Sequence, residues 1–312
     1  MAKPRIIFMG TPPFALPALE TLGNGNYAVA AVVTQPDRPA GRGRRDASPP
    51  VKQLAVKLGL EVLQPVKVRD ASFLEEFYQL NPDMVVVTAF GQILPKEIID
   101  FPRFGCLNIH PSLLPKYRGA APLNWSIIRG ETKTGVTIML MDEGMDSGDI
   151  IIQEETPLGE HETFGELHDR LAIMGAKLLV KAIDQVIRGQ AVRQKQDPAG
   201  VTFAPRLTKE TARINWHAQS RDIFNLIRGL SPSPAAYTTL DGQELKIFSA
   251  ETMPASHPAP PGTIAAAVAA GLPVAACDGY LIIREVQPAG KKRMPVADFL
   301  RGRRLEPGKI LG

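Results

Sequence analysis

The first half of the chain alternates short apolar runs with stretches in which apolar residues recur at helical spacing. The apolar runs predict strands at residues 5–9, 29–34, 84–88, 106–110, 135–141 and 150–155. The helical spacing predicts helices at residues 14–22, 51–58, 72–80 and 164–188. Strands and helices that alternate in this way form a parallel, doubly wound α/β sheet, whose ligands bind beyond the carboxyl ends of the strands. We therefore expect chemistry in the loops that follow the strands.

The pattern changes after residue 189. Residues 190–206 are rich in Gln, Pro, Gly and Lys without a clear period, which predicts a linker. Beyond it, one helix is predicted at 218–228 and short strands at 236–240, 245–249, 274–276 and 281–286. Turn pairs such as Asp241-Gly242 separate these strands, as in a small β-barrel. The predicted domains are therefore residues 1–189 and 207–312, joined by the linker.

Composition limits the class of protein. The chain has 312 residues, 44% of them hydrophobic and 22% charged, which is the balance of a globular enzyme or binding protein. The longest apolar stretch, 264–277, is interrupted by Gly271 and Pro273 and is too short to span a bilayer. The first apolar run is too short for a secretory signal, and the two cysteines form no metal or disulfide pattern. We expect a cytoplasmic protein without membrane contact.

Positive charge is unevenly distributed. Residues 1–206 carry 23 basic and 23 acidic side chains, whereas residues 207–312 carry 13 and 9, which accounts for the net charge of +4. One dense basic cluster lies in the neutral part, at Arg38, Arg42, Arg44 and Arg45. This segregation favours a polyanionic partner that contacts more than one region, although a merely solvated surface is the simpler alternative.

The turn after the first predicted strand argues against two common cofactors. It is Gly10-Thr11-Pro12-Pro13, in which prolines stand where a dinucleotide-binding turn needs glycines. The chain also contains no phosphate-binding loop of the Walker type. We therefore expect neither a bound dinucleotide nor ATP held by such a loop.

The densest polar group in the first half is built around Asn108 and His110. Two apart on a predicted strand, they point to the same side, and burying such a pair is costly unless it has partners or a function. Four carboxylates follow the next predicted strand, but their spacing is not that of a calcium loop, and we expect no metal. A loop carboxylate beside the imidazole would complete a trio suited to acyl transfer. Ser112 lies nearby but in no nucleophile motif, so the attacking group would belong to the substrate.

Segments in the same order along nearly the whole chain resemble the methionyl-tRNA formyltransferase family. They are residues 5–14, 34–43, 108–122, 135–148, 207–216 and 287–292, and they include the run Leu-Leu-Pro-Lys-Tyr-Arg-Gly-Ala-Ala-Pro at 113–122. This family transfers the formyl group of 10-formyltetrahydrofolate to the amino group of methionine on initiator methionyl-tRNA. The resemblance implies a doubly wound, Rossmann-like α/β formyltransferase domain followed by a small OB-like β-barrel domain that supports tRNA binding.

The resemblance also implies roles for single residues. Asn108 and His110 would polarise the formyl carbonyl and stabilise the oxyanion, while Asp146 would pair with His110 and assist proton removal from the attacking ammonium. The folate-binding residues that it implies are Ser112, Leu113, Leu114 and Pro115 together with Phe90, Gly91, Gln92, Ile93 and Leu94. The tRNA-binding residues that it implies are Arg38, Arg42, Arg44, Arg45 and Lys209.

Two other interpretations stay open. A folate-dependent formyltransferase that acts on a small amine, such as glycinamide ribonucleotide or an amino sugar, would share the trio. Pro111 matches the His-Pro-Ser-Leu-Leu-Pro form common in glycinamide ribonucleotide transformylase, which lacks the arginine-rich insertion and the C-terminal domain. The non-enzyme interpretation is an RNA-binding protein with an inactive catalytic domain, but the joint presence of all three trio residues argues against it. We expect a monomer, because nothing in the sequence requires an oligomer.

Overall fold

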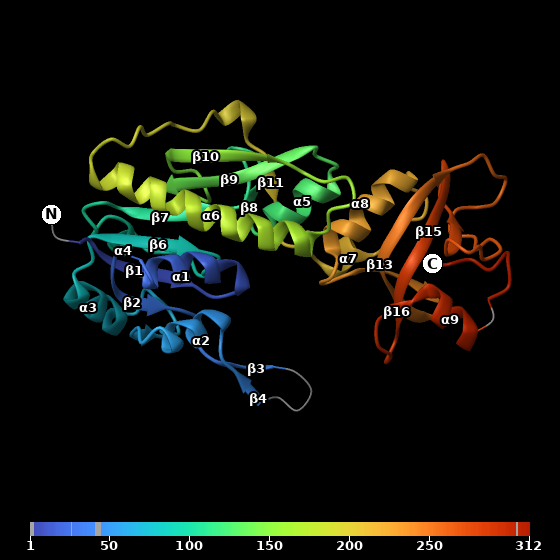
Figure 1. The fold of residues 1–312 in the computed structure, drawn as a ribbon, viewed down its shortest axis with the longest axis horizontal. Coiled ribbons are helices and arrows are strands. Elements are labelled where there is room, and N and C mark those ends of the chain that lie inside the picture. Colours follow the sequence, from blue (N-terminus) through green and yellow to red (C-terminus); the bar gives the residue numbers. More distant parts are fainter. Residues whose placement is uncertain (1–2, 26, 41–44, 304) are drawn as a thin grey trace. The chain divides into compact units, whose positions relative to one another are not determined.

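The computed structural model describes residues 3–25, 27–40, 45–303 and 305–312 (Figure 1). The chain forms two compact units that interleave along the sequence. Unit 1 contains Met1–Gly119, Thr134–Thr156 and His168–Phe203, and unit 2 contains Ala120–Lys133, Pro157–Leu167 and Ala204–Gly312. The division at residues 189 and 207 stays a prediction about domain boundaries along the sequence.

Unit 1 is built on a seven-stranded sheet with the order β10-β9-β7-β6-β1-β2-β5. Its strands are β1 (Arg5–Gly10), β2 (Ala28–Val33), β5 (Val62–Leu63), β6 (Met84–Thr88), β7 (Cys106–His110), β9 (Lys133–Leu140) and β10 (Ile150–Pro157). The five strands from β7 to β5 are parallel, which confirms the predicted doubly wound sheet. Strand β9 pairs antiparallel with β7, an addition at the edge that many such sheets carry.

Helices cover this sheet, and one of them fixes the position of β7. The helices are η1 (Pro13–Ala15), α1 (Leu16–Gly23), α2 (Pro50–Lys57), α3 (Ala71–Leu80), α4 (Lys96–Ile99), α6 (Phe164–Ile187) and η2 (Pro198–Gly200). A Cβ atom at Gly175 of α6 would lie 2.8 Å from the side chain of Ile109 on β7, so the glycine allows the helix to pack directly on this strand. Every residue of β6 and β7 is buried. The end of β7 is therefore held in rigid surroundings.

In the described part of the chain, four short strands outside the two larger sheets were not predicted. They are the strands β3 (Arg38–Ala40) and β4 (Arg45–Ala47), β8 (Arg118–Gly119) and β11 (Phe203–Ala204). Strands β3 and β4 form an antiparallel hairpin that extends away from the sheet of unit 1 (Figure 1). The hairpin contains the arginine-rich segment, whose charges and glycines give no apolar pattern from which a strand could be predicted.

Unit 2 contains the predicted small β domain. Its sheet has the order β12-β13-β15-β14, with β16 paired to β15, and each pairing is antiparallel. The strands are β12 (Ala236–Leu240), β13 (Gln243–Pro254), β14 (Leu272–Ala275), β15 (Gly279–Pro288) and β16 (Met294–Pro295). The helices are α5 (Pro122–Ile128), α7 (Lys209–Ala212), α8 (Ser220–Leu230) and α9 (Val296–Gly302).

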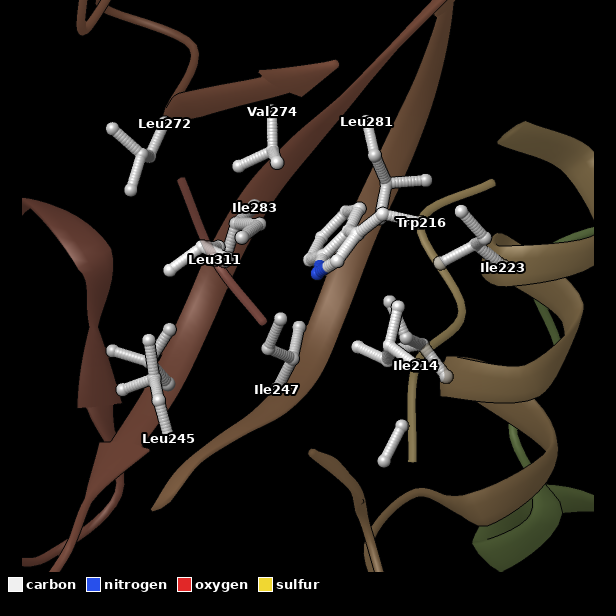
Figure 2. Close-up of a cluster of buried hydrophobic side chains, with 14 of the residues drawn as sticks. Ile214, Trp216, Ile223, Leu245, Ile247, Leu272, Val274, Leu281, Ile283 and Leu311 are labelled. Atoms are coloured by element: carbon white, nitrogen blue, oxygen red, sulfur yellow. The ribbon is translucent and has the colours of Figure 1, made fainter. Parts of the chain in front are cut away.

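The core of unit 2 lies between this sheet and α8 (Figure 2). Leu245 and Ile247 on β13, and Leu281 and Ile283 on β15, are two apart on their strands and therefore face the same side. Trp216 packs among them, and its indole N–H donates to the Thr238 hydroxyl at 3.0 Å. The apolar face of the sheet is thus closed without leaving the indole nitrogen unpaired.

Within the described residues, no helix is both long and apolar enough to cross a membrane.

Truncating the core of unit 2 should destabilise that unit measurably. Ile283 is fully buried and Ile310 is 58% exposed, so Ile283→Ala should lower the free energy of unfolding by about 2–5 kcal/mol and Ile310→Ala by less than about 0.5 kcal/mol. Both tryptophans, Trp125 and Trp216, lie in unit 2, so denaturant unfolding followed by tryptophan fluorescence reports on it. Equal losses in the two variants would contradict the assignment of this core.

Candidate active site

Two predicted residues lie together at the carboxyl end of β7. Asn108 and His110 are 9% and 4% exposed, and they are opposite Met139 and Thr137 of β9 in the antiparallel register. Among the residues that the structure describes, none forms a hydrogen bond with the Asn108 amide group. The amide atoms are not completely buried, so they keep their hydrogen-bonding capacity for a bound ligand.

The two ring nitrogens of His110 face different groups. Nε2 lies 3.0 Å from the carbonyl oxygen of Tyr117, and because a carbonyl only accepts, Nε2 carries a hydrogen in this contact. Nδ1 lies 3.6 Å from Oδ1 of Asp146. When the imidazole is protonated, Nδ1–H faces the carboxylate and the two groups form an ion pair. Their side chains are largely buried, which shields this pair from solvent.

Several contacts hold Asp146 in place. Its Oδ2 accepts a hydrogen bond from the backbone N–H of Gly119 at 2.8 Å, while its own backbone is left-handed with φ of 50°. The side-chain amide of Gln196 donates to the carbonyl oxygens of Asp146 and Gly148, both at 2.8 Å. Arg118 in turn donates twice to Oε1 of Gln196. The carboxylate therefore reaches His110 from a loop that other segments restrain.

Gln196, Arg118 and Gly119 were not predicted as site residues. Gln196 lies 50 residues from Asp146 along the chain and in the segment that the sequence indicates as a linker. No local pattern connects the two, and only the fold brings them together. The resemblance included Arg118 and Gly119 within its 108–122 run, but no role was attached to them.

The other carboxylates of the loop have different partners. Asp142 accepts hydrogen bonds from the Ser147 hydroxyl at 2.8 Å and from the N–H of Gly144, which stabilises the turn itself. Glu143 pairs with Lys96 at 2.6 Å on the surface. In the described part of the chain, no group of three or more His, Cys, Asp or Glu side chains is arranged to hold a metal ion. Of these three carboxylates, it is Asp146 that lies beside His110.

The segment predicted to bind folate after β7 is firmly anchored. Ser112 is buried, and its hydroxyl donates to the carbonyl of Lys116 at 2.7 Å, so this oxygen is engaged within the protein. The Thr137 hydroxyl donates to the carbonyl of Ser112 at 2.7 Å, and Gln153 donates to the carbonyl of Leu114 at 2.8 Å. Leu114 is buried, whereas Leu113 and Pro115 are half-buried. Only part of the segment is thus open to a ligand.

The second predicted folate segment turns sharply after β6. Gly91 is in the left-handed region, with φ of 87°, and the residue before Phe90 is also left-handed. Phe90 and Leu94 are buried in the core of unit 1, while Ile93 is 92% exposed. The Gln92 side chain accepts from the N–H of Val68 at 3.0 Å. An exposed apolar side chain and exposed backbone therefore lie on a turn fixed by its neighbours.

The predicted tRNA-binding residues are divided between the units. Arg38 opens β3 and donates to Gln35 at 3.3 Å, and Arg45 opens β4. Arg42 and Arg44 lie outside the described residues. Lys209 opens α7 in unit 2, where its ammonium lies 3.8 Å from Glu244.

A third residue of β7, on the same face as Asn108 and His110, carries a thiol group. Cys106 shares a strand face with Asn108 and His110, because the three are two apart. Burial raises the pKa of the Cys106 thiol to about 12, with a smaller contribution from the negative charge of Asp100. The thiol donates to the carbonyl of Ile98 at 3.4 Å. It is therefore protonated at neutral pH and is not a nucleophile.

Family models match both parts of the chain. Residues 4–183 match "Formyl transferase" and residues 206–304 match "Formyl transferase, C-terminal domain". Together with the doubly wound sheet and the Asn-His-Asp group, these matches define the protein as a formyl transferase.

Curated relatives match the chain from end to end. A methionyl-tRNA formyltransferase from Syntrophus aciditrophicus (strain SB) is 53% identical over 312 residues, covering 100% of both chains. One from Bacillus subtilis (strain 168) is 48% identical over 309 residues, covering 99% of this chain and 98% of the relative. The chain belongs to the methionyl-tRNA formyltransferase family.

Solved structures share the fold at lower identity. An N-formyltransferase from Helicobacter canadensis, in complex with folinic acid and dTDP-3-aminofucose, has a TM-score of 0.68 at 21% identity, covering 91% of this chain and 99% of that one. HypX from Aquifex aeolicus, in complex with tetrahydrofolic acid, has a TM-score of 0.64 at 18% identity, covering 96% of this chain and 47% of HypX. At these identities, the comparison concerns the fold alone.

The two cysteines should differ sharply in reactivity. Cys277 is exposed, whereas Cys106 is buried and its pKa is raised to about 12. A thiol reagent added to the native protein at pH 8 should therefore modify one thiol quickly, and Cys277→Ser should abolish this fast phase. Denaturation should release the second thiol. Rapid modification of Cys106 in the native protein would show that the end of β7 opens to solvent.

Proposed function

We propose that the protein transfers the formyl group of 10-formyltetrahydrofolate to the amino group of methionine on initiator methionyl-tRNA. The product is N-formylmethionyl-tRNA for translation initiation. The observation that carries the proposal is the buried pair of His110 and Asp146, 3.6 Å apart, beside the Asn108 amide that no described residue pairs. The methionyl-tRNA formyltransferases at 48–53% identity support this acceptor.

The trio provides the groups that formyl transfer needs. The neutral amine attacks the formyl carbon, a C–N bond forms, and negative charge develops on the formyl oxygen. The Asn108 N–H groups and the positive charge of protonated His110 stabilise that oxyanion. Asp146 stabilises the imidazolium and assists in removing the proton from the amine that has attacked. The C–N bond to the folate breaks as the folate nitrogen takes up a proton. No side chain of the protein becomes formylated.

Two segments near the trio fit a folate. The turn at residues 90–94 carries exposed backbone at Gly91 and an exposed apolar side chain at Ile93, which suit a flat heterocycle with several hydrogen-bonding groups. Residues 112–115 follow β7 directly along the chain, and Leu113 and Pro115 are half-buried and therefore open to contact. The folates bound in the Helicobacter canadensis and Aquifex aeolicus structures support a folate donor. We assign 10-formyltetrahydrofolate as the formyl donor.

In the proposed complex, the arginines of the β3–β4 hairpin and Lys209 of unit 2 contact the tRNA, because cationic side chains neutralise the phosphate backbone. Unit 2, which includes the basic C-terminal part, would contribute further to tRNA binding. We propose that the protein acts in the cytoplasm, where translation is initiated, and that it is a monomer. A small amine as the acceptor is not favoured, because the full-length relatives carry the tRNA activity in their names.

The acceptor can be tested directly. Formyl transfer from 10-formyltetrahydrofolate should be measured in parallel with charged initiator methionyl-tRNA and with glycinamide ribonucleotide. We expect transfer to the tRNA and none above background to the small amine. Transfer only to glycinamide ribonucleotide would preserve the chemistry of the trio but overturn the proposed acceptor. Transfer to neither, by a folded protein that still binds folate, would overturn the proposed reaction.

The role of His110 gives a second test. His110→Ala removes the positive charge beside the oxyanion and should lower kcat by about 10²–10⁴-fold. His217→Ala is the matched control, because His217 is exposed in unit 2 and should leave kcat unchanged. Single-turnover kinetics at saturating tRNA isolates the chemical step. If the His110 variant keeps its full rate, this residue takes no part in the chemistry.

A further inference from the structure

A single carboxylate joins the base of the β3–β4 hairpin to the body of unit 1. Asp37 lies directly before β3, and its side chain accepts three hydrogen bonds. Lys52 Nζ lies 2.7 Å from Oδ2, Gln64 Nε2 lies 2.8 Å from Oδ1, and the Ser48 hydroxyl lies 3.2 Å from Oδ2. Each donor comes from a different segment, so the carboxylate is the point where these segments meet.

The three donors have distinct structural effects. In the hairpin, Arg38 is opposite Ala47, so Asp37 and Ser48 are the next two residues that face each other. The hydrogen bond between their side chains therefore joins the two chain segments at the base of the hairpin. Lys52 lies on α2 and Gln64 follows β5, so these two contacts tie the hairpin base to a helix and a strand of unit 1. Gln64 also donates to the carbonyl of Gln35 at 2.9 Å, which fixes the approach to the hairpin.

The charge of Asp37 has the wrong sign for direct contact with a polyanion. The hydrogen bond from Lys52 is the main factor that lowers the pKa of the Asp37 carboxyl, and the bond from Gln64 lowers it further. The carboxylate is thus ionised at neutral pH and lies next to an arginine-rich segment. Taken alone, its negative charge would weaken the binding of RNA phosphates. Its three hydrogen bonds therefore indicate a geometric role.

We infer that Asp37 is a positioning residue for tRNA: it orients the β3–β4 hairpin so that the arginines of this segment meet the phosphate backbone together. This inference rests on the proposed function. Because Asp37 fixes the base of the hairpin before tRNA binds, less conformational entropy is lost when its arginines are ordered on binding. Asp37 does not touch the reacting atoms, and it should affect the affinity for tRNA without affecting the chemical step.

Asp37→Asn separates this role from simple electrostatics, because the two predict opposite signs. The substitution removes a negative charge, so electrostatics alone predicts tighter binding of tRNA. Loss of positioning predicts that the Kd for initiator methionyl-tRNA rises by about threefold to tenfold. The KM for tRNA should rise with it, while kcat and the Kd for the folate stay unchanged. Glu61→Gln is the matched control, since it removes the same charge at an exposed side chain directly before β5.

Salt dependence and a second variant make the test sharper. If fewer phosphates are contacted, the slope of log Kd against log salt should fall by about one for each lost contact, although Asp37→Asn removes no cation. When Asp37→Asn is combined with Arg42→Ala, the two changes in the free energy of tRNA binding should be less than additive, because both substitutions act through the same hairpin. Ser48→Ala changes no charge and removes a single hydroxyl, so it should weaken tRNA binding slightly even if the Asp37 variant does not fold.

The outcomes distinguish the two proposals. A wild-type protein that does not formylate methionyl-tRNA overturns the proposed function. If the wild type is active but Asp37→Asn binds tRNA as tightly as Glu61→Gln, with the same salt slope, the positioning role is wrong and the function stands. A fall in kcat at saturating tRNA would also contradict it, because positioning of the hairpin acts on binding.

Discussion

The candidate active site depends on how one carboxylate is held. Asp146 is largely buried, and a buried charge is tolerated only when it is paired and hydrogen-bonded. It meets this condition through the Gly119 N–H at 2.8 Å and the imidazole of His110 at 3.6 Å. These contacts fix the loop after β9 against the end of β7. Without these contacts, no carboxylate would be held beside His110 to balance the positive charge of its protonated form.

The sheet supplies the rigidity that this arrangement needs. Strand β7 is buried along its whole length, and α6 approaches it closely at Gly175, so Asn108 and His110 have little freedom to move. Cys106 shares their face of the strand but lies at its other end, where burial keeps the thiol protonated. Residues of one strand face thus differ in their surroundings: Cys106 is 1% exposed, whereas Asn108 is 9% exposed at the carboxyl end, where sheets of this type bind their ligands.

The Asn-His-Asp trio and the arginine-rich hairpin lie at different places in unit 1. The trio lies at the end of β7, whereas the arginine-rich hairpin follows β2 and is tied to α2 and the end of β5 through Asp37. Under the proposed function, this separation would let the affinity for tRNA change without moving the reacting groups. Unit 2 has its own core around Trp216, so its fold does not rest on the packing within the sheet of unit 1.

Local patterns of apolar and polar residues were enough to predict several elements. Strands β6, β7 and β12 begin and end where their apolar runs predicted, and α6 follows its helical period. The polar pair on β7 was also evident, because polar side chains are conspicuous in an apolar strand.

The sequence pattern did not reveal α5, which is short and begins with a proline, or the hairpin, whose arginines give no apolar alternation. The family resemblance already implied that Asp146 pairs with His110, whereas the contacts of Gln196 with the Asp146 loop and of Asp37 with three segments became evident only in the folded chain. These contacts link residues from 11 to 50 positions apart, and no periodicity extends over such distances. Burial and hydrogen-bond satisfaction select them, and both exist only once the chain has folded.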